Sequence, residues 1–497
     1  MLEELRLENF KAFKLLPNLD IKPITILCGT NSCGKSSILQ SILLTKQTVE
    51  TRQLGQTLLL NGRFTHLGMF DNIIFGKRPQ NEVVLQFSCV WKRGTIIERS
   101  TEPLLVLPTR WILERIFPEK YLKISDAKYL FHYRIALKLG DRRSPRTHLK
   151  PVFVNALDLS AEIQLPGNQT VDGPRVSFKK IENEKDVYSI TWSNIHSEQN
   201  ESGQGIGKVS FENLMPDEVT VVEATKKKRT THPISFDVLM FSQFLQQTFA
   251  TYRYIGPLRE EPSRRYIYED EVIEIGLKGE NAAYICLTDY DNKIHDCYLF
   301  DNNTDSFYKC TDPIKLGDAL TDWLETMSIN GFIPTPSNEI VYLNLESATS
   351  KNTRVNIADV GFGVSQVLPI LLEGLRMPMG HTLMLEQPEI HLHPKLQMQM
   401  ADYFISLALS KKRVIVETHS DHIVNRLVRR IVEDTQYNYN ELISIYFIKP
   451  TPHGSKWEKV NIDPEKGIIN WPEEFFDQTA TELQKTIQAG LKKRMSK

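Results

Sequence analysis

A glycine-bounded loop near the N-terminus constrains the fold of this chain more than any other feature. Residues 29–37 read GTNSCGKSS and match the spacing G-x-x-x-x-G-K-S/T. The apolar run 24–28 before the loop is typical of a strand buried in a parallel sheet, and apolar residues from position 38 onward recur at helical spacing. We therefore predict a strand–loop–helix unit of an α/β fold, with a helix that begins near Ser36.

The residue types of this loop suit a phosphate-binding site. Glycines let backbone N–H groups turn inward around phosphate oxygens, Lys35 can reach the β and γ oxygens, and the Ser36 hydroxyl can ligate Mg²⁺. The positive end of the following helix points toward the anion. We therefore predict that the loop binds ATP with Mg²⁺. The predicted ATP-binding residues are Gly29, Thr30, Asn31, Ser32, Cys33, Gly34, Lys35, Ser36 and Ser37.

Composition excludes several classes of protein. The 497 residues, 41% hydrophobic and 24% charged, are ordinary for a globular chain and exclude a disordered or fibrous one. The six cysteines are scattered, which indicates neither a disulfide framework nor a zinc knuckle. No apolar run approaches the roughly 20 residues of a membrane-spanning helix, and the first residues lack the pattern of a secretory signal. We expect a cytoplasmic protein without a membrane partner.

The hydrophobic pattern divides the chain into parts. Apolar β runs at 382–385, 414–416 and 442–448 alternate with helical patterns, as in a doubly wound sheet. Residues from about 80 to 250 instead show short alternating stretches broken by Pro and Gly, which indicates a largely β or mixed insertion. The glycine cluster 203–207 follows no apolar strand, so we expect a flexible loop there. The predicted divisions are 1–80 for the N-terminal part of the core, 81–250 for the insertion, 251–450 for the C-terminal part of the core and 451–497 for a C-terminal module ending in a packed amphipathic helix.

A second polar segment follows the apolar run 382–385. It places Glu386, Gln387 and Glu389 where ligands bind at the carboxyl ends of a parallel sheet. A carboxylate there can hold Mg²⁺, so Glu386 joins Ser36 as a predicted metal ligand. An amide such as Gln387 cannot take a proton from water, although it can orient one, and Glu389 could act as the base if the loop turns it inward.

Histidines near this segment allow another interpretation. Imidazole and carboxylate groups suit transition metals, and a ligand set could be assembled from them. The simpler interpretation gives each histidine a nucleotide-site or packing role. The residues concerned are His391, His393, His419, Asp421 and His422.

The motifs in this order resemble the ABC-type ATPases of the RecF and OLD (overcoming lysogenization defect) group, also described as AAA15-like. The resemblance is closest to a short-insert branch with a DUF3696-like C-terminus, and to ATPase subunits of bacterial anti-phage defence systems. It covers roughly residues 1–75 and 250–480, whereas the insertion resembles no family that we recognise. The segments that carry it, besides 29–37 and 381–394, are 7–13, 254–259, 359–366, 417–420 and 471–477.

The resemblance implies an ABC-type P-loop core, a mixed and mostly parallel sheet with flanking helices, interrupted by the insertion. It also implies a head-to-tail homodimer or higher assembly around two nucleotides, in which Ser365 caps the partner's γ-phosphate. The signature residues acting in trans would be Gly361, Gly363, Ser365 and Gln366, and the catalytic residues would be Glu386, Gln387, Glu389 and His419.

The resemblance also bears on function. Gln387 stands where most relatives carry the catalytic Glu, which implies slow hydrolysis. No nuclease motif follows His419, so the effector, such as a nuclease, would be a separate partner for which this ATPase is a sensor or switch. Two alternatives remain open: a non-hydrolysing scaffold locked by ATP, and a RecF-like DNA-repair ATPase.

Two basic runs in the insertion are candidates for nucleic-acid contact. Because the formal net charge is −1, DNA binding would depend on such local patches. Most charge runs of this kind are simply solvated loops. The residues are Arg142, Arg143, Arg146, Lys226, Lys227, Lys228 and Arg229.

Overall fold

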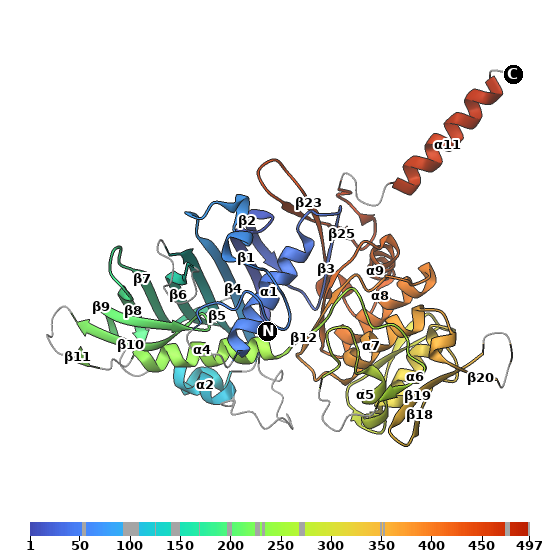
Figure 1. The fold of residues 1–497 in the computed structure, drawn as a ribbon, viewed down its shortest axis with the longest axis horizontal. Helices are drawn as coiled ribbons and strands as arrows, with labels where there is room; N and C mark the ends of the chain where they lie inside the picture. The colour runs from blue at the N-terminus through green and yellow to red at the C-terminus, as the bar shows by residue number, and fades with distance from the viewer. Residues whose placement is uncertain are drawn as a thin grey trace.

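The computed structural model describes most of the chain (Figure 1). The described residues are 1–51, 56–92, 109–124, 126–140, 150–167, 169–195, 201–223, 229–230, 234–267, 274–347, 350, 353–472 and 478–495. Two main sheets, with helices packed on them, lie side by side in Figure 1.

The larger sheet has ten strands in the order β11-β10-β9-β8-β7-β6-β5-β4-β1-β2, and every pairing in it is antiparallel. Buried and less buried residues alternate along strands such as β5, as expected where helices cover one face of a sheet. The strands are β1 (Leu2–Phe10), β2 (Phe13–Asp20), β4 (Val83–Lys92), β5 (Lys128–Leu139), β6 (Val152–Gln164), β7 (Thr170–Lys180), β8 (Val187–Ile195), β9 (Glu201–Glu212), β10 (Met215–Glu223) and β11 (Arg229–Thr230).

The smaller sheet has six strands in the order β12-β21-β22-β3-β23-β24. Its first five strands pair in parallel, and β24 pairs antiparallel to β23. Strand β22 is buried along its whole length, as in sheets covered on both faces. The strands are β3 (Ile24–Gly29), β12 (Tyr252–Ile255), β21 (Thr382–Glu386), β22 (Arg413–Glu417), β23 (Ile443–Lys449) and β24 (Lys456–Lys459).

Helices cover both sheets. Helices α1 and α4 contact each other, and α4 packs on β7, β8 and β10 of the larger sheet, whereas α5 to α9 lie on the side of the smaller sheet (Figure 1). The helices are α1 (Lys35–Glu50), α2 (Thr109–Ile116), α3 (Glu119–Leu122), α4 (Ile234–Ala250), α5 (Ala282–Thr288), α6 (Leu316–Thr326), α7 (Gly363–Arg376), α8 (Pro394–Leu409), α9 (Asp421–Glu433), α10 (Tyr439–Leu442) and α11 (Gln478–Met495).

Short strands complete the fold. Strands β13, β18, β19 and β20 form one small sheet, and β14 with β17, β15 with β16, and β25 with β26 form two-stranded sheets. Their bounds are β13 (Tyr266–Ile267), β14 (Lys293–Ile294), β15 (Tyr298–Asp301), β16 (Ser306–Lys309), β17 (Ile314–Lys315), β18 (Ile333–Ser337), β19 (Ile340–Glu346), β20 (Arg354–Asn356), β25 (Ile462–Asp463) and β26 (Gly467–Ile468).

Two hydrophobic clusters meet at the smaller sheet. Leu27 of β3 belongs to the cluster that contains α1, α4 and the larger sheet, whereas its neighbours Ile26 and Cys28 belong to the cluster under α5 to α9. Because successive residues of a strand point to opposite faces, β3 contributes to both clusters. The strand that leads into the phosphate loop is therefore packed from both sides.

The predicted mixed α/β class is confirmed, with a difference in pairing. A mostly parallel sheet does not describe the chain as a whole, because antiparallel pairs prevail. Most of the antiparallel pairs belong to the ten-stranded sheet of the insertion, which β1 and β2 extend instead of joining β3. The predicted divisions at residues 80, 250 and 450 stay predictions.

Two local predictions were wrong. The glycine cluster 203–207 lies inside β9, not in a flexible loop. There a Cβ on Gly203 would lie 2.7 Å from the Trp192 ring, so glycine allows close approach within the sheet. The terminal helix α11 leaves Leu483, Ile487 and Leu491 exposed, with Leu483 at 61%, instead of packed. Within the described residues, no helix is long and apolar enough to cross a membrane.

Candidate functional site

The phosphate loop joins the end of β3 to the start of α1, as the sequence predicts. Gly29 has φ +144°, and a Cβ there would lie 2.1 Å from the carbonyl oxygen of Ile448 in β23. Gly34, at the N-terminus of α1, has φ +100°, and a Cβ there would lie 2.7 Å from the Cβ of Ala12. Both positions combine a left-handed backbone with close neighbours, so both require glycine.

Lys35 folds back over this loop. Its ammonium group donates hydrogen bonds to the carbonyl oxygens of Gly29, at 3.1 Å, and Thr30, at 2.7 Å. The side chain is buried, with 3% of its surface exposed. The loop carbonyls carry only partial negative charge, so a bound phosphate would be a stronger partner for this cation.

Two carboxylates lie beside the loop at the ends of neighbouring parallel strands. Glu386 ends β21 and Glu417 ends β22, and the two residues pair in register. The Ser36 hydroxyl donates a 2.9 Å hydrogen bond to Glu417 Oε1. Glu386 Oε1 instead accepts a 2.9 Å hydrogen bond from the Tyr254 hydroxyl. The carboxylate in contact with the phosphate loop is therefore Glu417.

The electrostatic environment of these carboxylates favours a cation. Burial and, to a smaller extent, the nearby charge of Glu386 together raise the pKa of Glu417 to about 7, against the Ser36 hydrogen bond and the charge of Lys35. Burial also raises the pKa of Glu386. Two like charges in a buried place repel each other. A positive ion between them would relieve that repulsion.

The backbone after β21 is held in an unusual conformation. Gln387 has φ +47°, and its N–H donates a 2.7 Å hydrogen bond to the carbonyl oxygen of Glu417. The buried guanidinium of Arg259 donates to the carbonyl oxygens of Glu386, at 3.0 Å, and Gln387, at 3.3 Å. Burial lowers the pKa of Arg259 to about 10, while the charge of Glu389 opposes that shift. Arg259 therefore positions the segment that carries Glu386 and Gln387.

Glu389 links the segments after β21 and β22. Its Oε1 accepts a 2.7 Å hydrogen bond from the backbone N–H of His419, and its Oε2 accepts a 2.8 Å bond from the Thr418 hydroxyl. Burial raises the pKa of Glu389, although these hydrogen bonds oppose the shift. Burial and the charge of Lys35 lower the pKa of the His419 imidazole. The structure thus brings Glu386, Gln387, Glu389 and His419 together, with His419 close to Lys35.

The predicted signature segment begins α7. Ser365 donates a 2.8 Å hydrogen bond to the carbonyl oxygen of Phe362 and is 8% exposed. Phe362 is 49% exposed, and its ring centroid lies 5.9 Å from that of His391. Around Gly361 a Cβ would meet nothing within 4 Å. Within one copy, this segment therefore contacts the stretch after Gln387 and presents an exposed aromatic ring.

Sequence reasoning missed two residues near the site. Glu417 follows the apolar run 414–416, so the rule that selected Glu386 would also have found it. Lys11 lies in the turn between β1 and β2, where its ammonium group is bonded to Gln40 of α1. Burial lowers the pKa of Lys11, and the charge of Glu386 opposes that shift. No spacing in the sequence points to Lys11.

Two other predictions concern metals and nucleic acid. Among the described residues, no group of three or more His, Cys, Asp or Glu side chains is placed to hold a metal ion. Arg142, Arg143, Arg146 and the lysines at 226–228 lie outside the described residues, as does the side chain of Arg229. Nucleic-acid contact by these basic runs stays a prediction.

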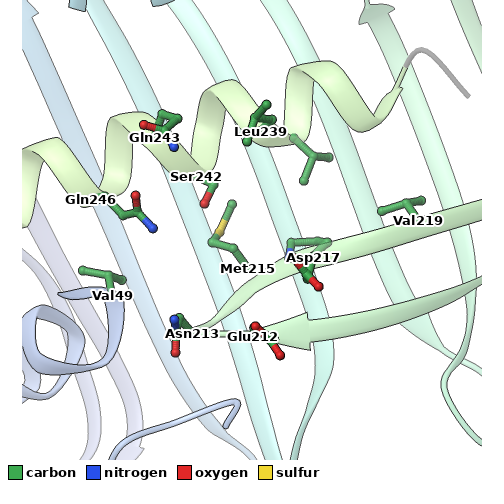
Figure 2. A pocket seen from close by; sticks show the side chains of 12 residues that line it. Val49, Glu212, Asn213, Met215, Asp217, Val219, Leu239, Ser242, Gln243 and Gln246 are labelled. Carbon is green, nitrogen blue, oxygen red and sulfur yellow. The ribbon is translucent and has the colours of Figure 1, made fainter. Parts of the chain in front are cut away.

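A separate hollow of about 330 Å³ lies at the C-terminal end of α1 (Figure 2). Val49, Met215 and Gln246 line it, from α1, β10 and α4. Val49 is fourteen residues beyond Lys35, or about 21 Å along the helix. The hollow is therefore distinct from the phosphate loop.

Comparisons with known proteins show the family to which this chain belongs. Curated proteins give no match. Solved structures that resemble the chain include "Crystal structure of the SmcHead bound to the C-winged helix domain of ScpA" (9% identity, 93% of this chain and 98% of that one, TM-score 0.37). Two others are the "SMC head domain from Thermotoga maritima" (9%, 93% and 99%, TM-score 0.33) and a Pyrococcus furiosus Smc head domain with an extended coiled coil bound to the C-terminal domain of ScpA (8%, 98% and 99%, TM-score 0.33). These scores are too low to establish a shared fold.

The family model AAA_15, described as "AAA ATPase domain", matches residues 1–86 and 175–424. The matched segments include the phosphate loop, Glu386, Gln387 and His419, and they span more than half of the chain. This protein is therefore an ATPase that belongs to the AAA ATPase domain family.

Proposed function

We propose that this chain is an ABC-type ATPase that binds Mg-ATP at residues 29–37, closes head to tail with a second copy around two nucleotides, and acts as a switch for a separate effector. The proposal rests on the arrangement of residues at one edge of the smaller sheet. There β3 ends in the phosphate loop, and β21 and β22 end in Glu386 and Glu417 beside it.

The loop residues fit a nucleotide with its metal ion. Lys35 would exchange its bonds to loop carbonyls for phosphate oxygens, and the start of α1 would direct backbone N–H groups and its positive end at them. The Ser36 hydroxyl and the carboxylates beside it are oxygen ligands of the kind that Mg²⁺ prefers. Bound Mg²⁺ would neutralise charge on the phosphates during their transfer.

The residues after β21 support slow hydrolysis. Gln387 has no group basic enough to deprotonate water, so it would orient the attacking water. Both oxygens of Glu389 already accept hydrogen bonds from the segment after β22. Burial and the charge of Lys35 lower the pKa of His419, which favours its neutral imidazole, and a neutral imidazole can accept a hydrogen bond from water.

The start of α7 supports a composite site. A helix N-terminus is a ready binding place for an anion, and the turn before Gly363 is open around Gly361. The adjacent Phe362 ring is exposed and could pack on a second copy. In a head-to-tail dimer, Gly361, Gly363, Ser365 and Gln366 would complete the partner's nucleotide site.

The proposal of a separate effector in anti-phage defence rests on the resemblance of the sequence motifs to anti-phage ATPases.

One specific observation favours a second candidate function, a scaffold locked by ATP. The usual catalytic carboxylate is replaced by Gln387, whose backbone is fixed by Arg259 and Glu417. The DNA-repair alternative depends on basic runs outside the described residues.

Phosphate release by the full chain with Mg-ATP tests the proposal, with Lys35→Ala as the blank and with duplex DNA added in parallel. Release above the blank supports the switch, whereas tight ATP binding without release supports the scaffold. Stimulation by DNA supports the repair function. Failure of the wild-type chain to bind ATP would contradict all three.

Ser365→Arg tests the composite site separately. It is expected to retain ATP binding by the single chain and to lose ATP-dependent self-association, measured by light scattering with size-exclusion chromatography. Dimer formation equal to that of the wild type would rule out the role of Ser365 in trans.

A further inference from the structure

We propose that Glu417 and Ser36 together hold the Mg²⁺ of the bound nucleotide, and that Glu386 has only a supporting position. The inference rests on the proposed function, because it concerns the metal of the same site. It departs from the sequence prediction, which gave the metal to Ser36 and Glu386.

The side-chain oxygens of Ser36 and Glu417 are spaced as two ligands of one Mg²⁺ ion would be. Ser36 Oγ lies 2.9 Å from Glu417 Oε1. Mg²⁺ binds oxygen at about 2.0–2.1 Å in octahedral geometry, which places adjacent ligand oxygens about 2.9 Å apart. The two oxygens therefore already have the spacing of neighbouring ligands. The Ser36 hydroxyl needs only to rotate, so that its hydrogen leaves and a lone pair faces the ion.

The second carboxylate oxygen of Glu417 is available to bind a cation. Glu417 is 4% exposed, and within the described part of the chain its Oε2 is buried and has no hydrogen-bond partner. Buried polar atoms are nearly always paired in folded proteins, and an unpaired carboxylate oxygen is costly. A cation, or a water bound to it, satisfies this oxygen without any rearrangement of the protein.

Glu386 is engaged differently. Its Oε1 accepts the hydrogen bond from Tyr254, and the charge of Lys11 lies close enough to favour its ionised form. Because it pairs in register with Glu417, it still contributes negative charge to the same edge. Mg²⁺ sites in nucleotide-binding proteins use one or two carboxylates together with phosphate oxygens and waters. Glu417 is the direct ligand here, and Glu386 acts through a water or through charge alone.

The backbone around Glu417 is fixed, which makes the position suitable for a ligand. Its carbonyl oxygen accepts the hydrogen bond from Gln387, and the next residue, Thr418, donates its N–H to Leu27 of β3 at 3.0 Å. Strand β22 therefore holds the carboxylate at a set distance from the phosphate loop. A glutamine at 417 would keep this frame and remove the charge.

ATP binding to the full chain, measured by calorimetry with Mg²⁺ and again with EDTA, tests the inference. The wild type is expected to bind more tightly with Mg²⁺. Glu417→Gln is expected to lower this metal-dependent gain by at least about 10–100-fold, the range found when only the hydrogen-bond partners of metal ligands are removed. Its affinity in EDTA should equal or exceed that of the wild type, because a negative charge near the phosphates is gone.

Three further variants separate the outcomes. Glu386→Gln should lose less of the gain than Glu417→Gln, and Glu482→Gln, an exposed residue of α11, should lose none. Lys35→Ala should weaken binding with and without metal, which tests the proposed function and not the metal ligand. Retention of the gain in Glu417→Gln, with its loss in Glu386→Gln, would overturn the inference and leave the proposed function standing.

A direct readout of the metal completes the test. Mn²⁺ replaces Mg²⁺, and its binding to the ATP-loaded chain is followed by electron paramagnetic resonance. Glu417→Gln should weaken Mn²⁺ binding, and Glu417→Asp, which keeps the charge but shortens the side chain, should fall between it and the wild type. Equal Mn²⁺ affinity in all three chains would overturn the inference. Thermal unfolding of each variant confirms that the chain is folded.

Discussion

The backbone N–H of His419 donates a 2.7 Å hydrogen bond to Glu389 Oε1. This bond ties the segment after β21 to the segment after β22, so the candidate water-activating residues cannot move independently. Through this bond Glu389 also stabilises the fold, in addition to any role in proton transfer.

Glu389→Gln should therefore lower the free energy of unfolding by about 1.5–3 kcal/mol, the range for hydrogen bonds to a charged group. A glutamine has one acceptor oxygen and no charge, so it cannot serve both His419 and Thr418 as the carboxylate does. Urea unfolding measures the change. Unaltered stability together with lost phosphate release would instead indicate that Glu389 acts as a base and does not stabilise the fold.

The raised pKa of Glu417 predicts a pH dependence of stability. The pKa is about 7 in the folded chain, against about 4.3 for an ordinary Glu. Between these values the folded chain binds a proton that the unfolded chain has released, so this group makes stability fall as pH rises from about 4 to about 7. The whole effect is about 4 kcal/mol, from the size of the shift.

Glu417→Gln removes this effect, because an amide does not ionise. Without nucleotide or Mg²⁺, the variant should be more stable than the wild type at pH 8, and the difference should shrink at pH 5. Urea unfolding at the two pH values measures it. An equal difference at both would show that Glu417 does not titrate in this range.

Two glycines of the candidate site should respond differently to alanine. Gly34→Ala places a methyl group 2.7 Å from the Ala12 Cβ at φ +100°, so we expect loss of ATP binding by the single chain. Gly361→Ala meets nothing within 4 Å, so stability and ATP binding should be unchanged. If Gly361 faces the partner's nucleotide, its variant should weaken only ATP-dependent self-association. Fluorescent nucleotide titration and light scattering separate the two effects.

Asp402 of α8 should be essential for stability. It is fully buried and accepts hydrogen bonds from Arg426, at 2.8 Å, and Arg430, at 2.8 Å, on α9. Asp402→Asn removes the buried charge that pairs with both cations and leaves them only exposed partners such as Asp305, which costs up to about 3–5 kcal/mol. Glu482→Gln is the control, because its ion pair with Lys485 is exposed and is worth about 0–1 kcal/mol. Equal losses in thermal or urea unfolding would contradict the distinction.

The local part of the site could be predicted from the sequence. The apolar run, the glycine spacing and the helical period locate β3, the loop and α1, with the helix beginning at Lys35 beside the predicted Ser36. The same reasoning places Glu386 at the end of a strand. These features depend on residues close together in the chain, where periodicity and backbone preference decide the structure.

The remaining contacts join distant parts of the chain. Ser36 and Glu417 are 381 positions apart, and Tyr254 and Glu386 are 132 apart. Such pairs depend on which strands become neighbours, and hydrophobic patterns do not specify that order. The same limit explains why β1 and β2 were not expected on the antiparallel sheet. Gly203 and Gly207 show the converse error, because glycine in a strand also serves close packing.

The two-sided packing of β3 has a consequence for dissecting this protein. Leu27 is covered by the half of the molecule that carries the ten-stranded sheet, and Ile26 by the other half. A fragment that lacks either half would expose one side of the strand from which the phosphate loop extends. Nucleotide binding and the integrity of both halves should therefore be lost together on truncation, so residues can be studied by substitution in the full chain but not in excised pieces.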